Sequence, residues 1–430
     1  MNFTWSVIVP LIGGLPLAMK NVFEKDPEYI MSYSPFQNND KHFVSYLRQH
    51  GWNGKYHVLD SVEDSCIADI CTDEPETDVD VVGAVCPCAG LSSLSVTSNA
   101  DSAVNQWLYT SAEYVLKNRK PKIFWGENAP RLATASGKKV ADELYEIGKK
   151  YGYHFLIYST ESRLHGNPQI RPRTFYFFFN KEHFASMPVL FDIPKETLSY
   201  EVILNKPLIE NDPMNILMNP NVPSKDPYYS FLYVHLKAES HRDLIEKLCP
   251  STNGDNKSAN LLVYSIDYVD KNYGGLDYLI DWFKDNGFER ASKRMSDVKA
   301  KREDNKGAWL HGTTVARDII PSFVAHMPSS LIHPYEDRYL YIREGLRLMK
   351  MPDDFMLTNE NPLRDLNHIC QNVIVTTAEL MCKEMILMLT GNSPVTDGSY
   401  AIQTNKGGMS IICDRTPTDD LSISSLDDFC

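Results

Sequence analysis

The sequence has no Cys-x-x-Cys pair among its nine cysteines, and it has no apolar run long enough to span a bilayer. The missing pairs argue against a zinc centre and a disulfide framework, so we expect reduced thiols and no metal. The apolar opening Trp5–Ala18 contains two prolines and two glycines and has no basic leader. We interpret it as a strand and turn rather than a signal peptide or a membrane anchor. These absences predict a cytoplasmic protein.

The chain also lacks an excess of positive charge. It has 43 Lys and Arg residues against 56 Asp and Glu residues, for a formal net charge of −13. This balance argues against a protein that coats nucleic acid through bulk charge, so any cationic nucleic-acid surface must be local. At 430 residues the chain can form one large domain or two moderate ones, and no internal repeat is visible.

The first 180 residues alternate short apolar strands with helical stretches, which is typical of an open, doubly wound α/β sheet. From about 185 to 325 the sequence is richer in proline turns and scattered aromatics, which indicates a separate lobe. Regular helices return over Arg343–Met349 and Asn372–Leu389. The strands predicted in the first part are Trp5–Pro10, Tyr29–Tyr33, Lys55–Leu59, Val79–Val85, Ile123–Trp125, His154–Tyr158 and Thr174–Asn180.

Three predicted strands end in side chains that can carry chemistry. The buried run Val79–Val85 leads into a turn with Cys88, and the next apolar run, Ile123–Trp125, leads to Glu127. Two arginines, Arg171 and Arg173, precede a third strand. The carboxyl ends of strands in such sheets are the usual ligand side, so Cys88 is placed to act as a nucleophile.

The order Pro-Cys-x-Gly-x-Ser at 87–92, Glu-Asn at 127–128 and Gln-x-Arg-x-Arg at 169–173 resembles the cytosine carbon-5 DNA methyltransferase family. Residues 333–344 and 366–375 resemble its last two motifs, in a version similar to bacteriophage members. The resemblance covers roughly 5–180 and 330–390. It implies a Rossmann-like class I methyltransferase fold with an inserted target-recognition domain. The expected parts are a catalytic domain at 1–185 and 329–395, a target-recognition domain at 186–328 and a partly flexible tail at 396–430.

The resemblance also implies roles for the residues at the strand ends. Cys88 matches the thiolate that adds to carbon 6 of cytosine, which makes carbon 5 able to attack a methyl group. Glu127 matches the acid at ring nitrogen 3, where protonation would assist the attack of the sulfur. Arg173 would hold the base or a phosphate, and Arg171 would brace the site. The target base must leave the double helix for this chemistry to occur.

The implied cofactor is S-adenosylmethionine, but the sequence departs from the family at its site. The opening Asp-Leu-Phe-x-Gly-x-Gly-Gly motif aligns with 7–14, where Leu11 replaces the first glycine and Val9 replaces the phenylalanine. No carboxylate follows the second strand, where the family has a ribose-binding acid. Three interpretations stay open: altered contacts to S-adenosylmethionine, a different electrophile, or a catalytically idle DNA-binding homologue. The residues implied at the site are Val9, Ile12, Gly13, Gly14, Ser34, Asp60, Pro87 and Asn372.

The expected partner is double-stranded DNA. Candidate contacts are Ser92 after the nucleophile and a basic cluster in the middle lobe, although neighbouring acids make a solvated helix face an equal alternative. The terminal segment 421–430 resembles peptides by which some phage replication proteins bind a sliding clamp. A phage-like member suggests a role in modification that protects viral DNA from restriction. The DNA-binding candidates are Ser92, Lys299, Lys301, Arg302 and Thr313.

Overall fold

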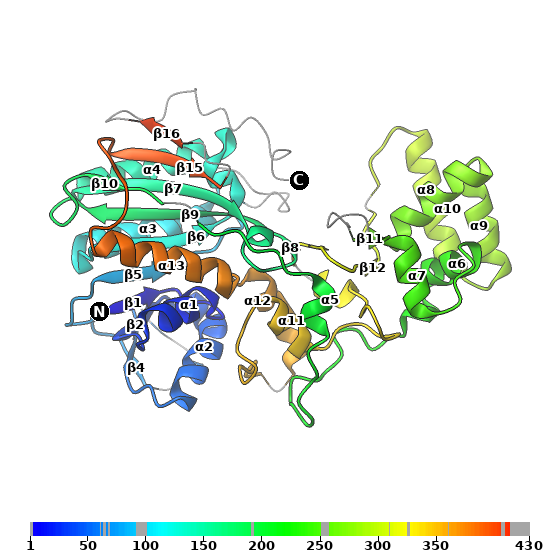
Figure 1. The fold of residues 1–430 in the computed structure, drawn as a ribbon, viewed down its shortest axis with the longest axis horizontal. Coiled ribbons are helices and arrows are strands. Elements are labelled where there is room, and N and C mark those ends of the chain that lie inside the picture. The colour runs from blue at the N-terminus through cyan, green and yellow to red at the C-terminus, as the bar shows by residue number, and fades with distance from the viewer. Residues whose placement is uncertain are drawn as a thin grey trace. The chain divides into compact units, whose positions relative to one another are not determined.

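The chain forms two units in a computed structural model (Figure 1). The first, here called the sheet unit, contains Met1–Thr197, Met349–Glu360 and Gln371–Cys430, and the second, the helical unit, contains Leu198–Leu348 and Asn361–Cys370. The structure describes residues 3–60, 62, 66–67, 69–91, 101–190, 193–250, 258–308, 310–324, 327–359, 361–405 and 409–412.

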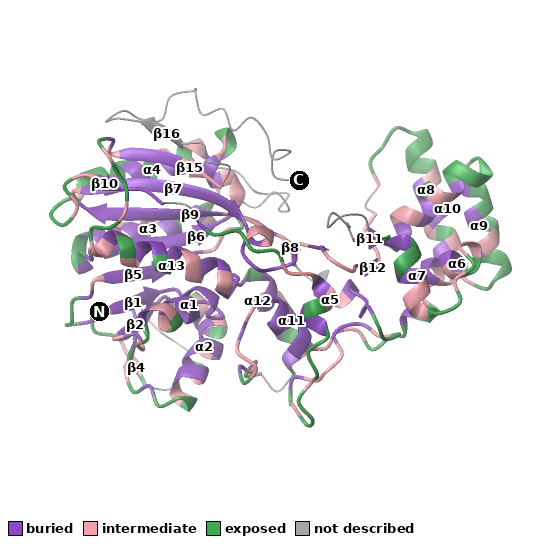
Figure 2. Cartoon of the chain, viewed as in Figure 1, coloured by how far each residue is buried: buried purple, intermediate pink, exposed green. Residues whose placement is uncertain are grey.

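Among the described residues, ten strands form the mixed sheet of the sheet unit. Their order across the sheet is β16-β15-β7-β9-β6-β5-β1-β2-β3-β4, and β9 and β16 run antiparallel to the others. The central strands are buried along their whole length, as Figure 2 shows. The strands are β1 (Trp5–Ile8), β2 (Tyr29–Ser32), β3 (Lys55–Val58), β4 (Ile70–Cys71), β5 (Val81–Ala84), β6 (Ile123–Asn128), β7 (Tyr153–Glu161), β9 (Pro172–Asn180), β15 (Tyr400–Thr404) and β16 (Met409–Ile412).

The direction of the winding reverses between β1 and β5. The chain passes from β1 through β2, β3 and β4 to one edge, and then returns to place β5 and β6 on the other side of β1. Ile8 pairs with Ala84, and Ala84 pairs with Gly126, so the carboxyl ends of β1, β5 and β6 are level. In open α/β sheets such a reversal creates the crevice where ligands bind.

Helices cover both faces of this sheet. A Cβ on Gly83 would meet Leu15 and Met19, which places one face of β5 against the first helix. Phe178 lies on the opposite face, where it contacts Gly148. The prediction of a doubly wound α/β sheet is therefore confirmed. The helices are α1 (Gly14–Phe23), α2 (Gln37–Gln49), α3 (Gln106–Tyr114), α4 (Lys138–Lys150) and α13 (Val375–Leu389).

The sheet unit is built from both ends of the chain. Helix α13 packs along α1, and β15 pairs in parallel with β7, with Ala401 opposite Leu156 (Figure 1). The expectation that residues after 395 form only a tail is thus wrong for 400–404, because these residues complete the sheet. Two short strands, β10 (Met187–Pro188) and β14 (Val395–Thr396), pair antiparallel in the same unit, which also contains β8 (Gln169–Ile170).

The helical unit has its own apolar core. Phe231, Leu279, Phe283 and Met295 are fully buried there, and Asp226 begins α6 by accepting hydrogen bonds from two backbone N–H groups. The sequence predicted a separate lobe here and the helix at Arg343–Met349, which matches α11, but it did not predict the bounds of the other helices. The elements are α5 (Tyr200–Leu204), α6 (Pro227–His235), α7 (His241–Leu248), α8 (Leu261–Tyr273), α9 (Leu276–Asp285), α10 (Glu289–Glu303), α11 (Ile342–Leu348), most of α12 (Leu366–Gln371), β11 (Ala259–Asn260), β12 (Thr314–Val315) and β13 (Ile320–Pro321).

Several expected boundaries differ from the observed ones. The first strand ends at Ile8 because Val9 has a positive φ of 51°. The last long helix begins at Val375 rather than Asn372, whose side chain is hydrogen-bonded elsewhere. The compact helical unit begins at 198 and runs to 348, whereas the expected lobe was 186–328. No helix in the described ranges is long and apolar enough to cross a membrane.

Candidate active site

Three of the predicted catalytic residues lie at neighbouring strand ends. Cys88 is in the turn that follows β5. Glu127 directly follows Gly126, which lies in β6 and pairs with Ala84 at the end of β5. Arg173 lies near the start of β9, which runs antiparallel beside β6. Strand register therefore brings the thiol, the carboxyl and the guanidinium to the same edge of the sheet.

The Cys88 thiol is half-buried and lies within electrostatic reach of three charged groups. Burial raises the pKa of Cys88, and the Glu127 carboxylate raises it further, whereas Arg173 and Arg171 lower it. Burial and Glu127 therefore favour the protonated thiol, and the two arginines favour the thiolate. Burial also raises the pKa of nearby Cys86 to about 11, which fits a structural residue.

The Glu127 carboxyl is buried, and one of its oxygens lies 2.5 Å from Nε of Arg173. Burial raises the pKa of Glu127, although Arg173 and Arg171 both oppose this shift. A carboxyl with a raised pKa can hold a proton near neutral pH and can therefore act as a general acid.

Asn372 connects Arg171 to the first helix. Its backbone oxygen accepts a hydrogen bond from Nη2 of the buried Arg171 at 2.8 Å, and its Oδ1 accepts one from the Gly14 N–H at 2.8 Å. Gly14 has no room for a side chain, because a Cβ would lie 1.9 Å from the carbonyl oxygen of Val373. These contacts give Asn372 a supporting position between the turn after β1 and Arg171.

The turn after β1 has an unusual backbone. Val9 and Leu11 adopt φ values of 51° and 50°, and Gly13 adopts 110°. A non-glycine residue in this region costs roughly 1–2 kcal/mol. Among the described residues, no hydrogen-bond acceptor contacts the N–H groups of Ile12 and Gly13, which precede α1. Free N–H groups at such a position suit a polar or anionic ligand atom.

Two more predicted cofactor residues lie together at the ends of β2 and β3. Oδ1 of Asp60 accepts hydrogen bonds from the Ser34 N–H at 2.8 Å and from the Ser34 hydroxyl at 3.0 Å. This pair brings a carboxylate to the end of β2, where the sequence alone shows none. Pro87 is in the same turn as Cys88, at the end of β5.

The sequence prediction missed an aromatic group beside Ser34. Trp107, at the start of α3, lies 5.1 Å from Phe36 and 4.9 Å from Tyr33 between ring centroids. Phe36 is partly exposed, so these rings offer an apolar surface next to the Ser34–Asp60 pair. Their separation in the sequence gave no local signal of this grouping.

The predicted DNA-binding residues of the helical unit are mostly occupied by internal contacts. On α10, Lys299 lies 2.6 Å from Asp277, and Arg302 lies 2.9 Å from Asp270. Lys301, on the same helix, is exposed. Thr313 is buried, and its hydroxyl donates to Asp226 at 3.0 Å. Ser92 lies outside the described residues, as does the segment 421–430.

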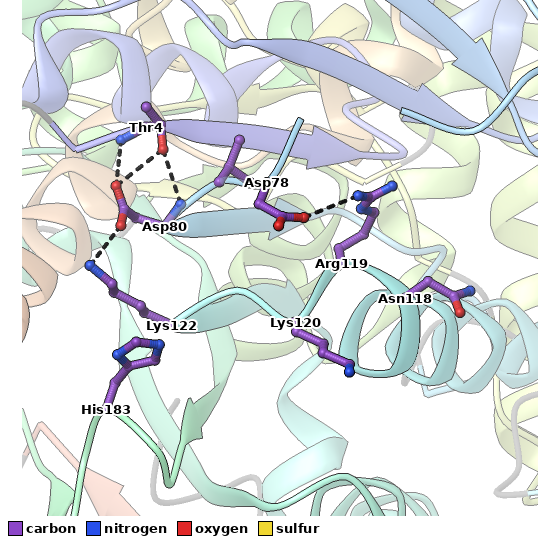
Figure 3. A pocket seen from close by; sticks show the side chains of 9 residues that line it. Thr4, Asp78, Asp80, Asn118, Arg119, Lys120, Lys122 and His183 are labelled. Atoms are coloured by element: carbon purple, nitrogen blue, oxygen red, sulfur yellow. Dashed lines mark hydrogen bonds and ion pairs between the residues drawn. The ribbon is translucent and has the colours of Figure 1, made fainter. Parts of the chain in front are cut away.

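A pocket of about 480 Å³ lies at the opposite edge of the sheet, where β1, β5 and β6 begin (Figure 3). Asp80 accepts a hydrogen bond from the Thr4 N–H at 2.8 Å and pairs with Lys122 at 2.8 Å. Arg119 lies 3.2 Å from Asp78. Most of the charges in this pocket are thus paired with one another, which indicates a role in joining the strand starts.

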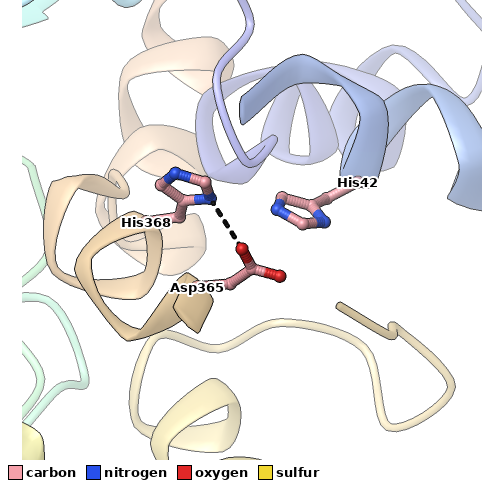
Figure 4. Close-up of side chains that lie close together, drawn as sticks. All are labelled: His42, Asp365 and His368. Atoms are coloured by element: carbon pink, nitrogen blue, oxygen red, sulfur yellow. Dashed lines mark ion pairs between the residues drawn. The ribbon is translucent and has the colours of Figure 1, made fainter. Parts of the chain in front are cut away.

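Figure 4 labels two histidines and an aspartate that have partners in their own units. In the helical unit, His368 lies 3.7 Å from Asp365. In the sheet unit, Nδ1 of His42 accepts a hydrogen bond from the Thr358 N–H at 3.1 Å.

The sheet order, the reversal at β1 and the strand-end residues define a Rossmann-like methyltransferase fold. The profile of the C-5 cytosine-specific DNA methylase family matches residues 12–386. The chain therefore belongs to this family.

A solved structure agrees on the fold. The chain is similar to a prophage-encoded E. coli protein assigned as a DNA modification methyltransferase, at 16% identity and a TM-score of 0.50, over 90% of this chain and 99% of that one. It is also similar to the Entamoeba histolytica methyltransferase EhMeth, at 10% identity and a TM-score of 0.47, over 90% and 99% of the two chains. A search of curated proteins finds no match.

Proposed function

We propose that the protein methylates carbon 5 of cytosine in double-stranded DNA, with Cys88 as the nucleophile. The observation that carries this proposal is the meeting of Cys88, Glu127 and Arg173 at the carboxyl edge of the sheet, beside the reversal between β1 and β5. A buried carboxyl with a raised pKa and a thiol whose pKa two arginines lower form the pair that addition to a pyrimidine ring requires.

The reaction starts with an extrahelical cytosine in the site. The Cys88 thiolate bonds to carbon 6 while Glu127 donates its proton to ring nitrogen 3, so that negative charge does not build up on the ring. Arg173 holds the base next to Glu127, and Arg171 supports this arrangement through Asn372. After transfer to carbon 5, a base takes the carbon-5 proton and the sulfur leaves as the thiolate. Ring nitrogen 3 returns its proton to Glu127, which restores the neutral ring.

The charges explain how the thiol is activated. An ionised Glu127 raises the pKa of Cys88, whereas Arg173 and Arg171 lower it. When Glu127 is protonated, its unfavourable effect on the thiolate is removed and the effect of the arginines remains. A protonated Glu127 and an ionised Cys88 therefore favour each other, which is the combination that the addition step uses.

The residues at the edge of the sheet fit S-adenosylmethionine. The Ser34–Asp60 pair can bind the hydroxyl or amine groups of an adenosine, and Phe36 with Trp107 can pack on its ring. The N–H groups of Ile12 and Gly13, with Val9 and Gly14 beside them, form the turn next to which the amino-acid part would lie. Pro87 would line the side toward Cys88. When bound, this cofactor supplies an electrophilic methyl group.

The helical unit is proposed to recognise the target DNA, as the inserted domain of the family. Lys301 is the better phosphate contact of the three basic candidates, because Lys299 and Arg302 are already paired with acids. We also propose that the protein acts in a bacterial cytoplasm and that its modification protects a viral genome from restriction. The protective role fails if the unmodified genome resists restriction equally well.

Mass spectrometry of nucleosides from cells expressing the protein tests the activity. DNA from cells with the wild-type chain should contain 5-methylcytosine, DNA from Cys88→Ala cells should not, and the control Cys71→Ala should behave as wild type. A different mass increment would indicate another electrophile, and no increment would indicate an idle homologue. A pool of duplexes with 5-fluorocytosine should trap a covalent adduct at Cys88, and its absence with the cofactor bound would refute the mechanism.

A further inference from the structure

The turn after β1 keeps a strained shape with bulky residues. Val9 and Leu11 both lie in the left-handed region, with φ values of 51° and 50°. Val9 is β-branched, and such residues rarely adopt this conformation. A conformation of this kind persists only when the surrounding structure holds it.

A buried carboxylate provides such a hold. Asp40 of α2 is fully buried, and its Oδ1 accepts a hydrogen bond from the Leu11 N–H at 2.9 Å. Its Oδ2 accepts a hydrogen bond from the Tyr56 hydroxyl at 2.9 Å and another from the Ser32 hydroxyl. The two hydroxyls come from neighbouring strands, so they fix the carboxylate relative to the sheet.

The same helix supports the turn at a second point. Phe43 lies three residues after Asp40, on the same side of α2. A Cβ on Gly13 would lie 2.6 Å from the Phe43 ring, so the backbone of Gly13 rests directly on this side chain. Helix α2 thus contacts the turn at Leu11 through a hydrogen bond and at Gly13 through packing.

We propose that Asp40 is a positioning residue for the cofactor: its bond to the Leu11 N–H holds the turn in the shape that leaves the N–H groups of Ile12 and Gly13 open to a ligand. This inference rests on the proposed function, because it takes S-adenosylmethionine as that ligand. It explains how a bulky Leu11 can occupy a position with a glycine-like backbone. Asp40 itself is closed off beneath the turn and does not touch the cofactor.

Binding of S-adenosylmethionine to the full chain, measured by isothermal titration calorimetry, tests this role. Asp40→Ala should weaken binding about 10-fold, because the Leu11 N–H loses its acceptor. Asp40→Asn should stay within about 3-fold of wild type, because the amide oxygen still accepts this bond. Leu11→Gly in the Asp40→Ala background should recover most of the affinity, since glycine adopts the turn without strain.

The rescue separates positioning from a general loss of structure. A merely structural Asp40 would leave the double variant as weak as Asp40→Ala, and that result would overturn the inference. Wild-type affinity in Asp40→Ala would also overturn it. Leu11→Gly alone should bind within about 2-fold of wild type and serves as the matched control.

Hydrogen exchange of the wild-type chain gives a measurement that needs no variant to fold. The Leu11 amide should be protected without cofactor, and the Ile12 and Gly13 amides should become protected only when S-adenosylmethionine is added. A rapidly exchanging Leu11 amide would refute the hold by Asp40. A wild-type chain that binds no S-adenosylmethionine would instead refute the proposed cofactor, while protection at Leu11 would still report on Asp40.

Discussion

Replacing Gly14 with alanine should loosen the contact between α1 and the segment that supports Arg171. The new Cβ would lie 1.9 Å from the Val373 carbonyl oxygen and 2.5 Å from Oδ1 of Asn372, so the backbone must move by about an ångström. Overpacking of this kind costs roughly 1–3 kcal/mol. Loss of the 2.8 Å bond from the Gly14 N–H to Asn372 adds about 1 kcal/mol. The expected local destabilisation is therefore about 2–4 kcal/mol.

Native-state hydrogen exchange of peptides from α1 and α13 measures this effect in the unit concerned. Asn372→Ala removes this hydrogen bond and the one from Nδ2 to the Met351 sulfur without overpacking, and it should cost about 1–2 kcal/mol. Gly307→Ala is the matched control, because nothing lies within 4 Å of a Cβ at that position and its φ is not positive. A Gly14→Ala chain within about 0.5 kcal/mol of wild type would refute the steric reasoning.

Three further changes test the charges in the structure. Glu127→Gln removes a carboxylate that raises the pKa of Cys88, so the pH profile of the alkylation rate of this thiol should shift to lower pH. Cys88→Ala supplies the background rate. An unchanged pH profile would contradict the coupling between Glu127 and Cys88. Burial raises the pKa of Asp40 from 3.8 to about 7, so its contribution to stability is complete below pH 4 and is lost as the pH rises toward 7. Asp40→Asn should flatten this part of the pH dependence in urea unfolding, by on the order of 4 kcal/mol, and a slope equal to wild type would argue against the shift. Lys301→Ala should reduce the dependence of DNA affinity on salt by about one counterion. Lys299→Ala should reduce it less, because Lys299 is already paired with Asp277. Equal effects of the two substitutions would show that this ion pair opens when DNA binds.

The positions of Cys88 and Glu127 at the edge of the sheet could be predicted from the sequence because each follows an apolar run at a short distance. A strand that is buried on both faces has a recognisable composition, and its carboxyl end is the ligand side of the sheet. Cys88 and Glu127 therefore needed only strand prediction and the family resemblance to be found. The two residues lie at neighbouring strand ends because β5 pairs with β6, with Ala84 opposite Gly126.

Other parts of the site depend on contacts between distant residues, which no local pattern reports. Asp40 is one acid among many in the sequence, and only the fold places it under Leu11. The Ser34–Asp60 pair joins two strand ends and places a carboxylate beside the end of β2. The ion pairs of the basic cluster on α10 could not be predicted for the same reason, since Asp270 and Asp277 come from other helices.

The position of β15 has a consequence for the synthesis of the protein. Residues 400–404 form the neighbour of β7, so more than two hundred residues leave the ribosome between the two partners. Until then β7 presents an open edge that can pair with other chains. A chain cut short before residue 400 would keep Cys88 and Glu127 but would be prone to aggregate through this open edge. In the full chain, chaperones that bind nascent chains would have to cover the edge of β7 until residues 400–404 are made.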